Sequence, residues 1–324
     1  MADIGKGPWL DFERPIVDLE EQIRTLEESA ASGGVDVGDE VAHLRRKAAR
    51  LSHEIFSRLQ PWQRVQLARH ARRPTTLDLV DRIFSDLVPL HGDRQFRDDE
   101  AIEGLMGRLD GRPVMIIGHQ KGRDTRSNLR RNFGMAHPEG YRKSLRLMNL
   151  AERYGRPVIT FIDTPGAYPG LGAEERGQAE AIARNLREMA DLDVPSISVV
   201  TGEGGSGGAL ALGVTDRIYM LENAVYSVIS PEGCAAILWR DATRAADAAK
   251  AMRLTAQDAL NLGIIDGIIK EPAGGAHRDH DGCAQAIKAQ LLEGLAAIGD
   301  PDPSQLRDQR LRKYLAMGEW TERR

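Results

Sequence analysis

Three short apolar segments, each entered through a proline, constrain the fold of this chain more than any other feature. They cover residues 114–117, 158–162 and 196–201. Proline is tolerated as the first residue of a strand because its missing N–H loses no ladder hydrogen bond there. Two of the three are continuous β-branched runs, which is typical of strands buried on both faces of a sheet. Helical patterns at residues 141–151 and 179–190 separate them, and this alternation predicts an α/β fold with right-handed crossovers.

The remaining sequence adds elements at both ends of this body. Apolar residues recur at spacings of three and four across residues 18–60, with a glycine-rich turn at residues 32–39, which predicts a helical hairpin. Further strands are expected at residues 216–221 and 264–269, and a further helix at residues 284–295. We expect an N-terminal helical arm that makes subunit contacts (1–73), a main domain (74–300) and a C-terminal polar tail (301–324).

Residues 202–213 read GEGGSGGALALG and follow the third apolar segment. Glycines bunched between a strand and a helix let backbone N–H groups converge on one point. The start of the helix adds N–H groups without intrahelical partners and the positive end of the helix dipole. The stretch, called the nest below, predicts a site that binds an anion or stabilises one that forms during a reaction. Close packing of helix on strand also favours glycine, but four glycines in five residues exceed what packing requires.

The nest also matches the G-x-S-x-G nucleophile elbow of serine hydrolases, with Ser206 as the nucleophile. That alternative needs an acid and, later in the chain, a histidine. The downstream candidates are Asp216, Asp266, His277 and His280. Both histidines belong to a contiguous polar run, residues 277–281, whose composition resembles a set of metal ligands but which we interpret as a surface turn.

A second loop, residues 163–170, leaves the end of the second apolar segment with the sequence DTPGAYPG. Ligands of α/β folds gather where strands end at their carboxyl edges. Prolines and glycines fix an irregular path here, and Tyr168 offers an amphipathic wall. The next helix is expected to open with Glu174, Glu175 and Arg176, which places a cation at the positive end of a helix. A nearby carboxylate-bearing ligand would explain that cation, and so would an ion pair with either glutamate.

A basic segment, residues 118–126 followed by Arg130 and Arg131, leaves the first apolar segment. It suits the phosphates of a nucleotide-bearing substrate, or it is a solvated loop. No acidic residue or histidine in these loops has a spacing that demands a general base. Asp163 and Glu203 are expected to hold the loop backbones by side-chain hydrogen bonds.

Composition excludes several classes of protein. The net charge of −4 over 324 residues gives no global basic field, so nucleic-acid binding is not expected. Two cysteines can build neither a disulfide framework nor a zinc site by themselves, so we expect no metal in this chain and reduced thiols in a cytoplasmic protein. No apolar run approaches the length of a membrane span, and the first residues contain no apolar signal region.

Seven motifs together resemble the α-subunit family of bacterial acetyl-CoA carboxylase carboxyltransferases. In chain order they are LDFERPI (10–16), GHQKGR (118–123), RRNFGM (130–135), DTPGAYPG (163–170), GEGGSGGALA (202–211), SVISPEGCA (227–235) and GGAHR (274–278). They follow the family's order and cover nearly the whole chain.

The resemblance implies a crotonase-like (ClpP/crotonase) fold of stacked ββα units around a twisted sheet. It also implies transfer of a carboxyl group from biotin, held on a biotin carboxyl carrier protein, to acetyl-CoA, which gives malonyl-CoA for fatty-acid synthesis. The implied partners are a homologous carboxyltransferase β subunit in an α2β2 heterotetramer and biotin carboxylase in the wider complex. Zinc is expected only on the β subunit, whose zinc-ribbon cysteines are absent here.

The resemblance also implies residue roles, carried over by position. The amides of Gly207, Gly208 and Ala209 would face the ureido oxygen of biotin, which becomes negative as the carboxyl group leaves. Substrate-binding roles fall on Gly204, Gly205, Ser206, Thr164, Pro165, Gly166, Ala167, Tyr168 and Arg176. Arg176 is a candidate for holding the transferred carboxyl group. The reaction needs two oxyanion sites and the chain has one strong nest, so we expect no activity without the partner subunit.

Three other interpretations remain open from the sequence. A stand-alone crotonase-type acyl-CoA hydratase or isomerase would share the fold but would require an acidic residue over the acyl chain. A serine hydrolase would depend on Ser206. A non-catalytic scaffold would tolerate bulky replacements of Gly207 or Gly208.

Overall fold

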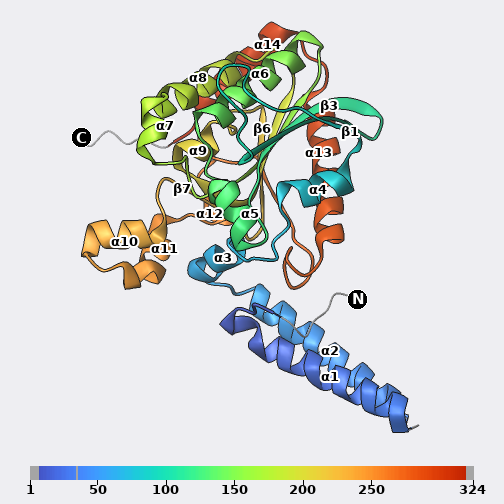
Figure 1. Ribbon diagram of the computed structural model, residues 1–324. Coiled ribbons are helices and arrows are strands. Elements are labelled where there is room, and N and C mark those ends of the chain that lie inside the picture. The colour runs from blue at the N-terminus through green and yellow to red at the C-terminus, as the bar shows by residue number, and fades with distance from the viewer. Residues whose placement is uncertain (1–6, 34–35, 319–324) are drawn as a thin grey trace, which may run out of the picture.

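A single eight-stranded sheet organises the chain (Figure 1). The computed structural model describes residues 7–33 and 36–318. The strands are β1 (Ser85–Pro89), β2 (Ile102–Leu109), β3 (Arg112–His119), β4 (Val158–Thr164), β5 (Ser196–Gly205), β6 (Arg217–Leu221), β7 (Val225–Ser227) and β8 (Gly267–Ile269). They run in the order β1-β2-β3-β4-β5-β6-β8, and β7 pairs with the last residues of β5. The first three strands are antiparallel, and β3 to β8 pair in parallel.

The parallel part of the sheet confirms the α/β prediction. All five predicted strands form, and every residue of β4 and β5 is buried, as continuous apolar runs require. The antiparallel pair β1 and β2 was not predicted, because β1 is largely exposed and β2 carries polar residues and glycines that weaken the strand signal. These two strands make the sheet mixed.

Helices cover both faces of the sheet (Figure 1). On one face α6 (Pro138–Arg153) packs against α8 (Gln178–Asp191), and on the other α4 (Thr76–Ile83) packs against α13 (His280–Ile298). The other helices of the body are α3 (Pro61–Ala68), α5 (Thr125–Arg130), α7 (Leu171–Glu175), α9 (Ser206–Leu210), α12 (Ala256–Asn261) and α14 (Pro303–Leu315). Short 3-10 turns are η1 (Asp11–Glu13), η2 (Asn132–Gly134) and η3 (Ala242–Arg244). The described part of the chain contains no helix with the length and apolar character needed to cross a membrane.

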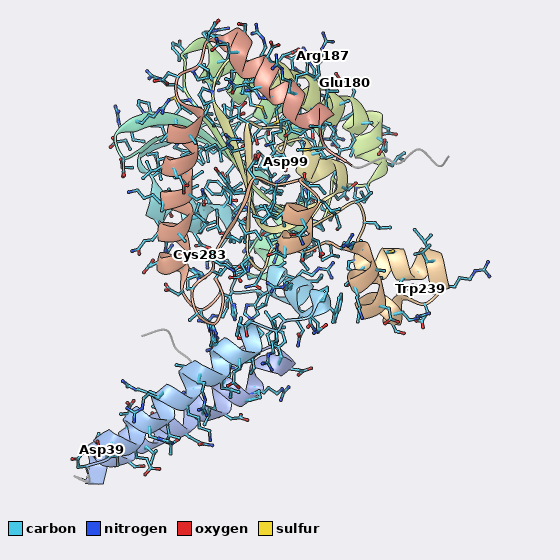
Figure 2. All side chains as sticks on the ribbon, turned by 180° about the vertical axis from the view of Figure 1, so that it is seen from behind. Asp39, Asp99, Glu180, Arg187, Trp239 and Cys283 are labelled. Atoms are coloured by element: carbon cyan, nitrogen blue, oxygen red, sulfur yellow. The ribbon has the colours of Figure 1, made fainter. Side chains whose placement is uncertain are left out.

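The predicted helical hairpin forms from α1 (Arg14–Gly33) and α2 (Gly38–Phe56). It projects from one end of the body, with Asp39 near its far end (Figures 1 and 2). Residues 34–35 of the predicted turn lie outside the described residues, and so do residues 1–6 of the arm. An ion pair between Arg45 and Glu27, 2.6 Å apart, joins the two helices.

Buried charges attach the arm to the body. The carboxylate of Glu13 lies 2.9 Å from Nε2 of His277 and 3.1 Å from Nε of Arg278. His277 is buried, so our interpretation of residues 277–281 as a surface turn was wrong at this position. Its partner Glu13 comes from the other end of the chain, which no local pattern could reveal. Glu13, His70 and His277 place possible ligand atoms within 4.8 Å of one another, but Arg278 already neutralises the carboxylate.

Helices α10 (Pro231–Trp239) and α11 (Ala245–Met252) form a small unit set apart from the sheet, with Trp239 at its outer side (Figures 1 and 2). Large apolar side chains on and before α10 face solvent: Val228, Ile237 and Leu238 are 83%, 71% and 65% exposed. A patch of this kind usually marks a contact with another protein.

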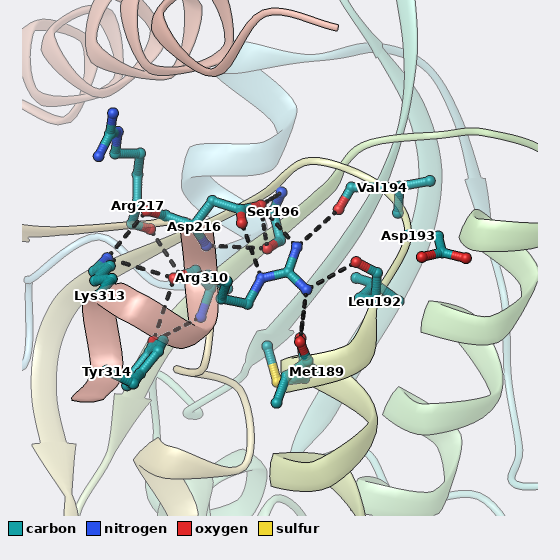
Figure 3. Close-up of polar contacts among 12 residues, drawn as sticks. Met189, Leu192, Asp193, Val194, Ser196, Asp216, Arg217, Arg310, Lys313 and Tyr314 are labelled. Carbon is teal, nitrogen blue, oxygen red and sulfur yellow. Dashed lines mark hydrogen bonds and ion pairs between the residues drawn. The ribbon is translucent and has the colours of Figure 1, made fainter. Parts of the chain in front are cut away.

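The C-terminal segment differs from the predicted polar tail. Residues 303–315 form α14, and its Arg310 is fully buried (Figure 3). The Arg310 guanidinium lies 2.9 Å from the carboxylate of Asp216 and donates to the carbonyl oxygens of Met189 and Leu192 at the end of α8. Asp216 also accepts from the N–H and the hydroxyl of Ser196, the first residue of β5. The sequence of this segment looks polar because the residue that anchors it to the body is an arginine, which becomes buried against Asp216. Residues 319–324 of the predicted tail lie outside the described residues.

Candidate active site

The loop after β4 and the nest after β5 meet backbone to backbone at the carboxyl edge of the sheet. A Cβ atom on Gly205 would lie 2.2 Å from the carbonyl oxygen of Pro165, and one on Gly208 would lie 2.7 Å from the carbonyl carbon of Gly166. Neither gap admits a side chain. These glycines are therefore required for the two loops to approach each other.

Gly207 is the exception in the nest. A Cβ atom there would meet only methyl groups of Ile182, at 3.6 and 3.7 Å, which is ordinary van der Waals contact. At Gly204 the ring of Tyr226 would lie 2.5 Å away, so that position is also closed. Close packing thus explains why three of the four clustered positions are glycine. The prediction that packing alone does not explain these glycines holds only for Gly207.

The nest presents backbone N–H groups without a side-chain cap. Helix α9 follows β5 directly, and Gly205 at its N-cap position has no side chain to accept from the first-turn amides. Ser206 has φ 49°, a left-handed conformation that turns the chain sharply from strand to helix. The amides of Gly207 and Gly208 therefore belong to the orphan donors of a helix start. Such donors can hydrogen-bond an oxyanion.

The loop after β4 is rigidly held around its glycine. Thr164 Oγ1 donates to the carbonyl of Gly166 at 2.6 Å and accepts from its N–H at 3.1 Å. The N–H of Tyr168 donates to the carbonyl of Ala136 at 3.0 Å, and the Tyr168 ring lies on that of His137 with centroids 4.2 Å apart. The structure thus brings residues 164–167 against the nest, whereas Tyr168 packs on His137.

A buried ion cluster lies beside both loops. The Lys121 ammonium sits 2.7 Å from Asp163 and 2.9 Å from Glu203, and Arg69 Nε lies 2.7 Å from Glu203. Asp163 also accepts from the N–H of Glu203 at 2.9 Å, so it holds the loop backbone as expected. The same expectation was wrong for Glu203, whose carboxylate accepts from the side chains of Arg69 and Lys121. Burial alone would raise the pKa of Glu203, but Lys121 and Arg69 outweigh it and keep the pKa below its usual value. Glu203 therefore stays ionised and paired.

Arg176 lies between two helices and not in the first turn of one. Helix α7 ends at Glu175 and α8 begins at Gln178, with Gly177 at φ 82° between them. The guanidinium pairs with Glu139 at 2.6 Å, neither with Glu174 nor with Glu175, and lies over the Phe96 ring. Its hydrogen bond to Glu139 raises the pKa of Arg176. Its role toward a substrate carboxyl group remains a prediction.

None of the predicted triad partners lies with Ser206. Asp216 is bound by Arg310, and Asp266 lies 2.5 Å from the Lys313 ammonium. His277 pairs with Glu13, and His280 lies 2.7 Å from the carbonyl oxygen of Arg72. The geometry therefore gives no support to a serine hydrolase built from these residues.

Sequence reasoning missed three residues that shape the site: Lys121, Arg69 and Glu139. Lys121 was noted only as part of a basic loop, and its position just after a strand was the available signal. Arg69 was included only in the predicted N-terminal arm (1–73). Glu139 is fully buried on α6 and holds Arg176, and nothing in the local sequence marks it.

Comparison with known proteins is consistent with this geometry. Residues 9–318 match the family described as acetyl co-enzyme A carboxylase carboxyltransferase-like. The acetyl-coenzyme A carboxylase carboxyl transferase subunit alpha of Thermus thermophilus is 54% identical over 313 residues, which cover 97% of this chain and 99% of that protein. Its counterpart from Gemmatimonas aurantiaca is 56% identical over 319 residues, 98% of this chain and 99% of that protein.

Solved structures agree on the fold. A Pseudomonas malonate decarboxylase hetero-tetramer in complex with coenzyme A aligns with a TM-score of 0.53 at 18% identity, over 65% of this chain and 84% of that chain. The hetero-dimer of a Pseudomonas malonate decarboxylase gives a TM-score of 0.52 at 19% identity, over 66% and 89%. The mixed sheet and these neighbours confirm the crotonase-like fold. This chain belongs to the α-subunit family of acetyl-CoA carboxylase carboxyltransferases.

Proposed function

We propose that this chain is the α subunit of an acetyl-CoA carboxylase carboxyltransferase, and that it moves the carboxyl group of carboxybiotin to acetyl-CoA to form malonyl-CoA. The observation that carries the proposal is the start of α9, where the first-turn amides have no side-chain cap and the position of Gly207 is not closed by packing. The membership of the chain in a carboxyltransferase family supports the same reaction.

The chemistry needs hydrogen-bond donors more than it needs an ionisable side chain. When the N–C bond of carboxybiotin breaks, its electron pair moves onto the ureido group, whose oxygen becomes negative. The amides of Gly207, Gly208 and Ala209 would stabilise that charge. The methyl group of acetyl-CoA gives up a proton, which the ureido nitrogen can accept, and its carbon then forms the new C–C bond with the carbon dioxide released from carboxybiotin. The buried carboxylates Asp163 and Glu203 are occupied by Lys121, so they hold the loops in place.

The walls of the site are assigned to the two loops. Gly204, Gly205 and Ser206 would line the approach to the amides, and the segment Thr164 to Tyr168 would line the biotin side. Arg176 is partly exposed, which suits contact with a carboxylate. Glu139 would set its orientation.

The partner subunit would supply the second oxyanion site. Exposed apolar side chains at Val228, Ile237 and Leu238 follow β7, which pairs with the last residues of β5, and this supports a protein contact close to the nest. We expect a homologous β subunit that carries zinc, an α2β2 heterotetramer, a biotin carboxyl carrier protein and biotin carboxylase, all in the cytoplasm. The arm (1–73) would add subunit contacts to the main domain (74–300).

A matched pair of variants at one position tests the proposal. Gly207→Pro removes one N–H donor and Gly207→Ala keeps it, and the Cβ atom that both residues add has room beside Ile182. The assay is malonyl-CoA-dependent carboxylation of free biotin by the chain reconstituted with its zinc-containing partner. Loss of one donor is expected to lower kcat by about 10²–10³-fold in Gly207→Pro. Gly207→Ala should stay near the parent rate.

Thermal unfolding of both variants separates loss of a donor from loss of structure, because proline restricts the residue before it. Equal activity of the two folded variants would contradict a catalytic role for the nest amides. Malonyl-CoA consumption by the isolated chain would contradict a shared site. Hydration of an enoyl-CoA by the isolated chain would instead favour the hydratase interpretation.

A further inference from the structure

A cavity of about 510 Å³ lies between α6, α8 and the loop that precedes residue 98. Five arginines line it: Arg94, Arg142, Arg146, Arg153 and Arg184. They come from three separate parts of the chain. The protein as a whole has a net charge of −4, so this concentration of positive charge is local.

The charges in this cavity are poorly neutralised. Among the described residues, only Arg142 of the five has a carboxylate within 4.0 Å, that of Glu180 at 3.8 Å. Surface arginines elsewhere pair closely, as Arg82 does with Asp281 at 2.6 Å. Two carboxylates, those of Asp93 and Glu180, also line the cavity, so five positive charges face two negative ones and an excess of three remains. The Asp93 Oδ1 in addition accepts the N–H groups of residues 95–97 and caps the loop. The positive charge therefore exceeds what the protein itself balances.

The loop and α6 bring two guanidinium groups together at Gly92. Arg146 donates from Nε to the carbonyl of Gly92 at 3.0 Å and from Nη2 to that of His91 at 3.1 Å. A Cβ on Gly92 would lie 3.7 Å from Nη1 of Arg94, so this side chain folds back over the same glycine. Arg94 has φ 64°, a conformation that costs free energy for a residue with a side chain. Burial and the neighbouring Arg94 lower the pKa of Arg146.

Helix α6 adds further donors in register. Arg142, Arg146, Asn149 and Arg153 are spaced by four, three and four residues, so they share one face of the helix. Arg184 faces them from α8 across the cavity. This arrangement surrounds the cavity with planar, multivalent donors.

We propose that this cavity binds a small anion that carries two or more phosphate groups. Guanidinium groups match phosphate oxygens in bidentate geometry and remain charged at any physiological pH. One phosphate group would engage about two guanidinium groups. The five arginines, from three elements, line a space large enough for more than one phosphate group. The site is separate from the nest and does not depend on the reaction proposed above.

Titration calorimetry on the full-length chain tests this proposal, with inorganic pyrophosphate as the probe at fixed ionic strength. We expect saturable binding at one site per chain. Arg184→Gln and Arg94→Gln should each weaken binding about tenfold or more, because each removes a charge-assisted contact. The control is Arg187→Gln, which removes an exposed arginine of the same helix that does not line the cavity (Figure 2). It should bind like the parent, and thermal unfolding should show that all three variants fold.

Two further ligands sharpen the result. Citrate carries similar charge without phosphate, and binding of citrate as tight as that of pyrophosphate would overturn the assignment to phosphate. A nucleoside diphosphate distinguishes the sources of the ligand: binding tighter than that of pyrophosphate assigns the site to a nucleotide, and weaker binding assigns it to free pyrophosphate. No saturable binding of either probe, or equal loss in Arg187→Gln, would overturn the proposal.

Discussion

The two ends of β5 are fixed in opposite ways. At its start, Ser196 donates to the carboxylate of Asp216, and Arg310, from a helix near the end of the chain, pairs with that carboxylate (Figure 3). At its end, the strand closes against another loop through bare backbone, at Gly205 and Gly208. One end depends on a buried ion pair across distant sequence, and the other on the absence of side chains.

The two ends differ in the kind of atom that fixes them. At the start of β5, the Arg310 guanidinium satisfies the carboxylate of Asp216 and the carbonyl oxygens of Met189 and Leu192. At the end of β5, backbone atoms of residues 165–167 occupy the space of a Cβ added to Gly205 or Gly208. The chemistry is proposed at the rigid end, where donors must stay in place as charge develops.

The largest expected effect is at the start of β5. Arg310→Ala leaves Asp216 buried without its partner and frees the carbonyls of Met189 and Leu192. Breaking such a pair from one side costs about 3–5 kcal/mol of unfolding free energy. Chemical denaturation measures it, and Arg312→Ala, whose side chain is 82% exposed, is the control. A loss below about 1 kcal/mol would remove the contrast between the two ends.

The next effect is at the rigid end. Gly208→Ala places a Cβ 2.7 Å from the backbone of Gly166, and overpacking of this kind costs about 1–3 kcal/mol. The loops must then separate, so carboxylation by the reconstituted complex should fall as well. Gly207→Ala, where the Cβ has room, should change neither quantity. If both alanine variants behave alike, close approach of the loops is not what selects glycine.

Acid should weaken the end of β5 through Glu203. Lys121 and Arg69 lower its folded pKa below the value of 4.5 expected in the unfolded chain, although burial opposes them. A lowered pKa contributes stability above pH 4.5, and that contribution disappears as the pH falls through the folded value. Unfolding free energy measured from pH 6 to 3 should fall less in Glu203→Gln than in the parent. An identical slope would show that this cluster does not titrate with folding.

The smallest effect is expected at Ser206. Its hydroxyl faces solvent, and none of the predicted triad partners lies beside it. Ser206→Ala keeps the backbone amide, so rate should change less than about twofold and stability by less than about 0.5 kcal/mol. Complete loss of activity would revive a nucleophilic role for this residue.

Local patterns predicted five of the eight strands, and they put the candidate site at the carboxyl edge of the sheet. Apolar runs entered through proline marked β3, β4 and β5, and glycines after β5 marked the nest. Long-range contacts were out of reach, because Arg310 and His277 look like surface residues until Asp216 and Glu13 are known to meet them. The distinction between Gly207 and Gly208 also needed the opposing loop. Each miss reflects a partner remote in sequence.

The position of Arg310 has a consequence for biosynthesis. A chain still attached to the ribosome has made all eight strands before this residue leaves the exit tunnel. Until then, Arg310 cannot pair with Asp216 at the start of β5. A chain that ended upstream of α14 would leave Asp216 without the guanidinium that neutralises it.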